Sequence, residues 1–241
     1  MLKLIRHKVH GFVYLLSNPS QLKHIILRET RYRFRNKSKR MWVEWQKYDS
    51  ERAYDAMVAA LHDTRTRPFN QERIKIISEM VDPLGKGLNI LDVGAGDGII
   101  GEHIMKMGNN VVAVDLPTVT IQAHRCQGLL AVAGDAERLS FASNIFDVVL
   151  ASEIIEHLWN PHSFVDEAYR VLKADGHLII STPEGIEGLR YDAHKYYFTV
   201  ETLEQMLGAK FDLCEVKRLK PAYTATPTII LLFRKSAIPK N

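Results

Sequence analysis

The stretch Leu88-Asn89-Ile90-Leu91-Asp92-Val93-Gly94-Ala95-Gly96-Asp97-Gly98 decides the fold. A short apolar run leads into three glycines at alternate positions, and a second apolar run begins at Ile99. Glycines at a strand-to-helix turn let the chain turn tightly and let a ligand approach the bare backbone. The spacing is G-x-G-x-G, and the chain contains no G-x-x-x-x-G-K-[ST], so neither the usual dinucleotide fingerprint nor a phosphate-gripping P-loop is predicted.

Outward from this turn, short apolar strands alternate with helical stretches over about residues 87–235. We expect strands at Leu88–Val93, Asn110–Asp115, Leu129–Ala133, Phe146–Ala151, His177–Ser181, Phe211–Leu219 and Thr228–Phe233. Helices are expected at about 97–107, 118–126, 162–172 and 200–208. This alternation predicts an α/β fold with a mostly parallel sheet covered on both faces. The last two strands have no helix between them, so we expect them to pair antiparallel at one end of the sheet.

Acidic residues follow the next two strands. Asp115 ends the second strand, 21 residues beyond Gly94, where a carboxylate reaches a ribose diol. Gly134-Asp135-Ala136 follows the third strand, where a carboxylate can accept a hydrogen bond from an exocyclic adenine amine. Each acid alone is also typical of a loop or a helix cap. Together, at three successive strand ends, they indicate an adenosine with a tail that is not a phosphate.

These segments, with Phe146-Asp147-Val148-Val149 and Val171-Leu172-Lys173-Ala174-Asp175-Gly176-His177-Leu178-Ile179-Ile180, resemble the successive motifs of class I S-adenosylmethionine (SAM) methyltransferases. The resemblance covers about residues 85–210. It implies a Rossmann-like seven-stranded sheet whose last strand is reversed. It also implies that SAM is bound by Asp92, Gly94, Gly96, Gly98, Asp115, Leu116, Asp135 and Ala136. The segment Ala174-Asp175-Gly176 departs from the Pro-Gly-Gly of many relatives, in a loop that is structural.

A second constellation, Glu153-Ile154-Ile155-Glu156-His157, directly follows the fourth strand. On a helix, Glu153, Glu156 and His157 would share one face. Two carboxylates and an imidazole suit a divalent metal such as Mg²⁺ or Mn²⁺, and His194, after the fifth strand, is a candidate fourth ligand. Without a metal, His157, Glu153 or His194 could orient the substrate or act as a base. A role at a helix start or in the core is the third alternative.

Glu-x-x-Glu-His resembles two branches of methyltransferases. One comprises the O-methyltransferases of ubiquinone biosynthesis, and the other comprises the 2′-O-methyltransferases that act on the 3′ end of small RNAs. Both imply a cation that binds two oxygens of a diol or catechol beside the methyl group. The same Glu-His pair also occurs in methyltransferases with no assigned metal.

Composition sets wider limits. The chain has 241 residues, of which 46% are apolar and 25% charged, as in ordinary globular proteins. Two cysteines, Cys126 and Cys214, fit a reducing compartment, and Cys214 is expected to be buried because it alternates with apolar neighbours. No run approaches the roughly 18 apolar residues that span a bilayer, so a cytoplasmic protein is expected.

Charge divides the chain. Residues 1–50 carry a net charge of +9 and residues 51–241 a net charge of −5. We expect a basic N-terminal arm at 1–40, a helical cap at 41–84 and a SAM-binding domain at 85–241. In the cap, Ile74, Ile77 and Met80 form an apolar stripe that ends at Asp82-Pro83.

The arm combines an amphipathic pattern with a cluster of cations. Its apolar stripe (Leu2, Ile5, Val9, Phe12, Leu16) precedes seven cations between Arg28 and Arg40, with Tyr32 and Phe34 among them. An anionic membrane surface, RNA or a phosphorylated carrier could bind such an arm. A solvated extension or a helix that packs on the protein would show the same pattern.

The sequence therefore predicts a SAM-dependent methyltransferase that acts on an oxygen of a small, lipid-linked or saccharide acceptor, peripheral to the membrane through its arm. One alternative is an RNA 2′-O-methyltransferase that holds the RNA backbone with the arm. The other is a SAM-binding partner protein without catalytic activity.

Overall fold

A seven-stranded mixed sheet forms the centre of the computed structural model, which describes residues 68–115, 129–185, 194–219 and 227–237. The strands are β1 (Asn89–Val93), β2 (Asn110–Asp115), β3 (Leu130–Ala133), β4 (Phe146–Ser152), β5 (Leu172–Pro183), β6 (Phe211–Leu219) and β7 (Thr228–Lys235). Their order is β3-β2-β1-β4-β5-β7-β6. The first five strands are parallel, and β7 lies antiparallel between β5 and β6. The predicted seven-stranded fold with a reversed last strand is confirmed.

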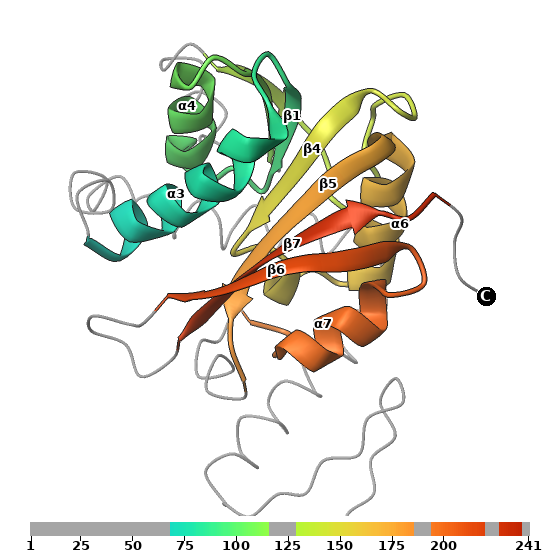
Figure 1. The fold of residues 1–241 in the computed structure, drawn as a ribbon. Helices are drawn as coiled ribbons and strands as arrows, with labels where there is room; N and C mark the ends of the chain where they lie inside the picture. The colour runs from blue at the N-terminus through green and yellow to red at the C-terminus, as the bar shows by residue number, and fades with distance from the viewer. Residues whose placement is uncertain (1–67, 116–128, 186–193, 220–226, 238–241) are drawn as a thin grey trace, which may run out of the picture. The chain divides into compact units, whose positions relative to one another are not determined.

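Helices cover both faces of the sheet (Figure 1), as the near-continuous apolar strands predict. α3 (Pro68–Val81) and α4 (Ile99–Lys106) share one core cluster with the sheet, while α6 (Pro161–Val171) and α7 (Val200–Leu207) share the other. Successive residues of β4 alternate between the two clusters, because side chains alternate across a strand. Val148 packs with α3 and α4, and Val149 packs with α6 and α7.

α3 confirms the apolar stripe expected before the sheet. Ile74, Ile77, Met80 and Val81 are all buried. Pro68 begins the helix, in the first turn, where its missing N–H costs nothing. A short 3₁₀ turn, Asp82–Leu84, follows and leads to β1.

One burial prediction is wrong. Cys214 is exposed, because β6 is an edge strand and its register with β7 shifts between Leu213 and Glu215. Cys214 is the extra residue of this bulge and has no partner on β7. The expected helix at 118–126, the cofactor residue Leu116 and the basic arm lie outside the described residues.

Candidate active site

The glycine turn after β1 has the left-handed backbone that its sequence predicts. Gly94, Gly96 and Gly98 have φ angles of 67°, 55° and 71°. The amides of Gly94 and Ala95 both donate to the carbonyl of Val114 at the end of β2, at 2.8 and 3.2 Å. A Cβ atom built on Gly96 would meet nothing within 4 Å. The turn therefore presents bare backbone to open space at Gly96.

Asp115 lies against this turn. Its Oδ2 accepts a hydrogen bond from the Gly96 amide at 2.8 Å, so the end of β2 is tied to the middle of the glycine turn. Gly134, at the end of β3, donates in turn to the carbonyl of Asp115 at 2.9 Å. The predicted ribose and adenine residues therefore follow one another along the carboxyl edge of the sheet.

Asp92 lies beneath the turn and is only 2% exposed. The pKa of its carboxyl group is raised to about 7, first by burial and next by the negative charge of Asp115, while a hydrogen bond from the Gly101 amide partly offsets both. The space between Asp92 and α4 is narrow, since a Cβ on Gly101 would lie 2.9 Å from Oδ2 of Asp92. Asp92 thus touches the helix that the turn begins, and its predicted contact with SAM stays a prediction.

Asp135 and Ala136 form a compact turn after β3. Oδ1 of Asp135 accepts from the Glu137 amide at 2.9 Å, and the carbonyl of Asp135 accepts from the Arg138 amide at 3.0 Å. Ala136 is buried at 7% exposure. The turn is therefore held by its own hydrogen bonds, with the small Ala136 on its inner side.

The loops after β1 and β4 meet at one point. A Cβ atom on Gly94 would lie 2.3 Å from Cδ1 of Ile154, so Ile154 packs directly over the bare backbone of Gly94. β1 and β4 are neighbours in the sheet although β2 and β3 follow β1 in the chain. Ligands of open α/β sheets bind in the crevice at such a reversal of strand order.

Three of the four predicted metal ligands converge beside this point. The ligand atoms of Glu156, His157 and His194 all lie within 4.8 Å of one another. Nε2 of His157 is 3.9 Å from Oε1 of Glu156, and the two imidazole rings are 4.7 Å apart, edge to face. The predicted meeting of His157 and His194, 37 residues apart in the chain, is therefore confirmed.

Backbone and side-chain contacts hold the two segments together. The amides of Lys195 and Tyr196 both donate to the carbonyl of Glu156, at 2.7 and 3.3 Å. The Tyr196 hydroxyl donates to the carbonyl of Trp159 at 2.9 Å, and Nζ of Lys195 donates to the carbonyl of His157 while lying over the Trp159 ring. His194 is placed by its neighbours in the chain.

Glu156 is the buried member of the cluster. Its side chain is 1% exposed, and the Thr182 hydroxyl donates to Oε2 at 3.0 Å. Oε1 has no hydrogen-bond partner among the described residues. Burial, and next the charge of Glu153, raise the pKa of Glu156 to about 8. A cation bound at this oxygen, which faces an imidazole and lacks a donor, would stabilise the charged carboxylate that burial disfavours.

The helical spacing expected for Glu153 is wrong. A 3₁₀ turn covers only Ile155–His157, and Glu153 has a left-handed φ of 56°. Its backbone amide donates to the carbonyl of Ser181 at 2.9 Å, and the Ser181 hydroxyl donates to its Oε1 at 3.1 Å. These bonds to β5 turn Glu153 away from the face expected for it, so the structure does not bring it into the three-residue cluster.

Arg73 on α3 is the functional candidate that sequence reasoning missed. Its side chain is 14% exposed and lies 3.8 Å from Oε1 of Glu153. Its charge partly offsets the rise in the pKa values of Glu153, Glu156 and Asp92, and its buried Nε has no partner in the described part of the chain. Arg73 falls in register with Ile77 and Met80, at i, i+4 and i+7. A positively charged residue on the apolar face of a predicted helix was the feature of the sequence that could have indicated this role.

Comparison with known proteins shows what this chain is similar to. Residues 91–180 match the model of a family described as "Methyltransferase domain". This part of the chain is therefore similar to methyltransferase domains. The chain is similar to the ubiquinone biosynthesis O-methyltransferase of Azorhizobium caulinodans, at 38% identity over 103 residues, which is 40% of this chain and 41% of that protein. It is also similar to the mitochondrial enzyme of that name from Rattus norvegicus, at 34% over 140 residues, which is 53% of this chain and 40% of that protein. The chain thus spans about two fifths of these relatives.

Solved structures agree with the fold described above. The N-methyltransferase NodS of Bradyrhizobium japonicum in complex with S-adenosylhomocysteine (SAH) has a TM-score of 0.63 and 19% identity, over 72% of this chain and 90% of NodS. The [4+2]-cyclase SpnF has a TM-score of 0.62 and 16% identity, over 73% of this chain and 85% of SpnF. One fold thus serves a methyltransferase and a cyclase, so the acceptor chemistry must be argued from the site.

The comparisons confirm the resemblance to methyltransferases and support SAM as the cofactor of the domain. The family match ends at residue 180, before His194. Among the described residues, no helix is both long enough and apolar enough to cross a membrane.

Proposed function

We propose that the protein transfers the methyl group of SAM to an oxygen of a small hydroxyl acceptor. The convergence of the glycine turn with Glu156, His157 and His194, joined where Ile154 packs over Gly94, carries this proposal. SAM fits the open backbone at Gly96 and the acids along the strand ends. The O-methyltransferase names of the relatives favour oxygen as the acceptor atom.

Methyl transfer is an in-line displacement, so much of the acceleration comes from holding the acceptor oxygen and the methyl group close and aligned. An alcohol or phenol must also lose its proton. His157 and His194 are half-buried imidazoles in contact with each other, and a neutral imidazole is a common general base. Ile154 and the buried Leu158 pack in the core cluster on either side of the Glu156–His157 pair.

The same three residues fit a divalent cation. Glu156 supplies an oxygen without a donor, and His157 and His194 supply imidazole nitrogens. Oxygen and imidazole together suit Mg²⁺ or Mn²⁺ better than a thiophilic ion. A bound cation would lower the pKa of an acceptor hydroxyl and hold it in place. Glu153, which the sequence assigned to this set, instead holds Arg73 and β5.

The acceptor is proposed to be lipid-linked or a saccharide, brought to the site by docking of the basic arm on an anionic membrane. The charge split near residue 50 supports this part of the proposal. RNA bound by the same arm is the competing outcome, tested in the Discussion.

Turnover with alanine variants tests the proposal. His157→Ala and His194→Ala should each lower methyl transfer by about 100-fold, as expected for a lost base or ligand, and should leave SAH binding by calorimetry intact. The exposed His103 on α4 provides the control, His103→Ala. Normal turnover in both site variants would refute the site.

Chelation separates the two chemical roles. If a cation acts, a chelator should abolish turnover while SAH still binds, and Mn²⁺ or Mg²⁺ should restore turnover. Full turnover in the chelator, combined with loss in His157→Ala, would refute the cation and retain the imidazole base.

A further inference from the structure

Glu137 joins the loop after β3 to the loop after β4. Its Oε1 accepts two hydrogen bonds from consecutive backbone amides, Trp159 at 2.5 Å and Asn160 at 3.0 Å. Hydrogen bonds from amides to a carboxylate are among the stronger ones in proteins. Glu137 directly follows Asp135 and Ala136, and Trp159 lies two residues beyond His157. One side chain thus connects the predicted adenine turn to the segment that carries the histidine.

The end of this bridge on the β3 loop is rigid. The amide of Glu137 is bound by Asp135, and the amide of Leu139 donates to Oε2 of Glu167 on α6 at 2.7 Å. Arg170 of the same helix donates to the carbonyls of Leu139 and Phe141, at 2.9 and 2.7 Å. α6 therefore fixes the base of the loop, and Glu137 reaches from it towards the active site.

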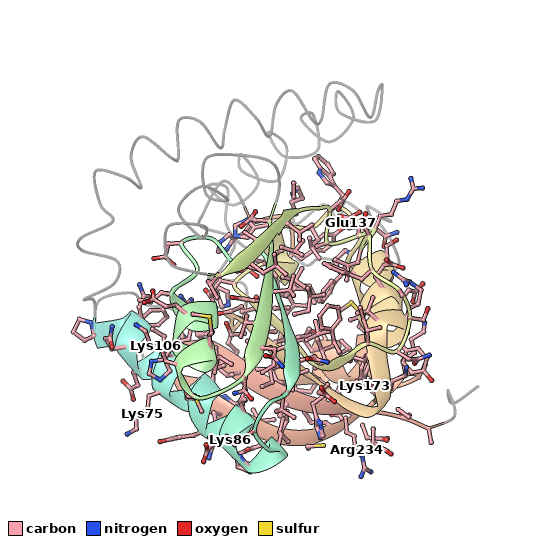
Figure 2. All side chains as sticks on the ribbon, turned by 90° about the horizontal axis from the view of Figure 1, so that it is seen from above. Lys75, Lys86, Lys106, Glu137, Lys173 and Arg234 are labelled. Atoms are coloured by element: carbon pink, nitrogen blue, oxygen red, sulfur yellow. The ribbon has the colours of Figure 1, made fainter. Side chains whose placement is uncertain are left out.

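The other end of the bridge lies in an extended segment. Leu158 has φ −66° and ψ 153°, so the chain is extended after the 3₁₀ turn, and the amides of Trp159 and Asn160 donate to Glu137 instead of to a helix carbonyl. Tyr196 binds the carbonyl of Trp159 from one side, and Glu137 binds its amide from the other. Figure 2 shows Glu137 at the opposite end of the sheet from Lys86 and Lys173, which lie near the starts of β1 and β5.

We propose that Glu137 is a positioning residue through which cofactor binding at Asp135 and Ala136 fixes the segment 157–160, and with it His157. The proposal rests on the proposed function, because it takes the adenine of SAM to lie at this turn. A ligand that packs against the turn restricts the side chain of Glu137, and Glu137 restricts the amides of Trp159 and Asn160. His157, as general base or as metal ligand, is then aligned only when the methyl donor is bound.

The fluorescence of Trp159 can report on the movement of the segment 157–160. The chain has three tryptophans, Trp42, Trp45 and Trp159, so replacing the first two with Phe leaves one reporter within the segment. Nζ of Lys195 lies 4.5 Å from the centre of the Trp159 ring, which makes its emission sensitive to small movements of the segment. SAH should change this emission in the reporter protein with the native Glu137.

Glu137→Ala should still bind SAH by calorimetry, should lose the emission change, and should lower kcat by about 10- to 100-fold with little change in KM for SAM. Glu137→Gln keeps an acceptor oxygen, so it should retain most of the emission change and most of the kcat of the native protein. Glu167→Ala is the matched control, because it loosens the same loop from α6 but leaves the bridge to Trp159 intact; it should keep the emission change.

Glu137→Asp keeps the charge but shortens the reach, so it replaces the alanine variant if that protein does not fold. An unchanged emission response in Glu137→Ala or Glu137→Asp would overturn the proposal, as would loss of SAH binding in either. Failure of the native protein to bind SAH would refute the proposed function instead.

Discussion

Single residues set the backbone of the cofactor turn. Gly96 has a positive φ, which strains any other side chain, and its missing Cβ faces open space. A branched side chain would be strained and would occupy the place proposed for the ligand.

Gly96→Val should therefore abolish SAH binding in calorimetry. Gly87→Val is the matched control, because Gly87 has a φ of 68°, nothing within 4 Å of its Cβ position, and a place before β1 at the other end of the sheet. Both variants should lose similar stability, and only Gly96→Val should lose the ligand. Unchanged binding in Gly96→Val would remove the turn from the cofactor site.

Asp92 should make stability depend on pH. Folding raises its pKa from 3.8 to about 7, so the folded protein binds more protons than the unfolded chain between these values. Stability from this group is complete below pH 3.8 and falls as the pH rises to 7. Relative to Asp92→Asn, the free energy of unfolding of the native protein should fall by up to about 1.4 kcal/mol per pH unit in this window. Urea unfolding from pH 4 to 8 measures the difference, and a constant difference would contradict a buried titration.

At the scale of elements, the site depends on contacts between segments far apart in the chain. α3 supplies Arg73, the loop after β4 supplies Glu153, and β5 supplies Ser181. Burial raises the pKa of Glu153 and the charge of Arg73 opposes this rise, so each side chain compensates for the burial of the other.

Arg73→Met should lower the free energy of unfolding at pH 8 by about 1–3 kcal/mol, because it leaves the Glu153 carboxylate without its cation. The double variant Arg73→Met/Glu153→Gln should recover part of this loss, a coupling that a double-mutant cycle measures. Lys75→Met, on the exposed side of α3, should change little. Additive losses would mean that the two side chains act independently.

At the scale of the whole molecule, the distribution of charge separates the part proposed to bind SAM from the part proposed to bind an anionic surface. Residues 51–241 contain all the proposed cofactor and cluster residues and are mildly acidic, whereas residues 1–50 carry the cations. Attraction of an arm to an anionic surface is about 1 kcal/mol per basic residue and weakens with salt.

Replacing three arm cations with Gln should weaken sedimentation with anionic vesicles and leave SAH binding unchanged; the variant carries Gln at Arg28, Arg31 and Arg33. The control replaces three exposed lysines of the described part with Gln, namely Lys75, Lys86 and Lys106 (Figure 2). Only the arm variant should lose vesicle binding, and the native protein should lose it steeply as salt rises. Salt-dependent retention of RNA without vesicle binding would favour the RNA alternative.

The sequence by itself determined the sheet, the glycine turn and the order of acids along its edge. These features follow from local rules, because alternation of apolar strands with helices and the need for glycine at positive φ are written in neighbouring residues. The expected order of the strands also predicted that His194 lies near His157. The contacts of Lys195 and Tyr196 that position His194 appear only in the fold.

Only the tertiary structure decided the rest. Glu153 left the predicted ligand set because Ser181 on a neighbouring strand holds it in a left-handed conformation. Cys214 became exposed because pairing with β7 shifts by one residue. Arg73 and Glu137 act across gaps of 80 and 22 residues, to Glu153 and Trp159 respectively. Local patterns carry the periodicity of an element, whereas the partner of a polar side chain depends on which distant backbone packs beside it.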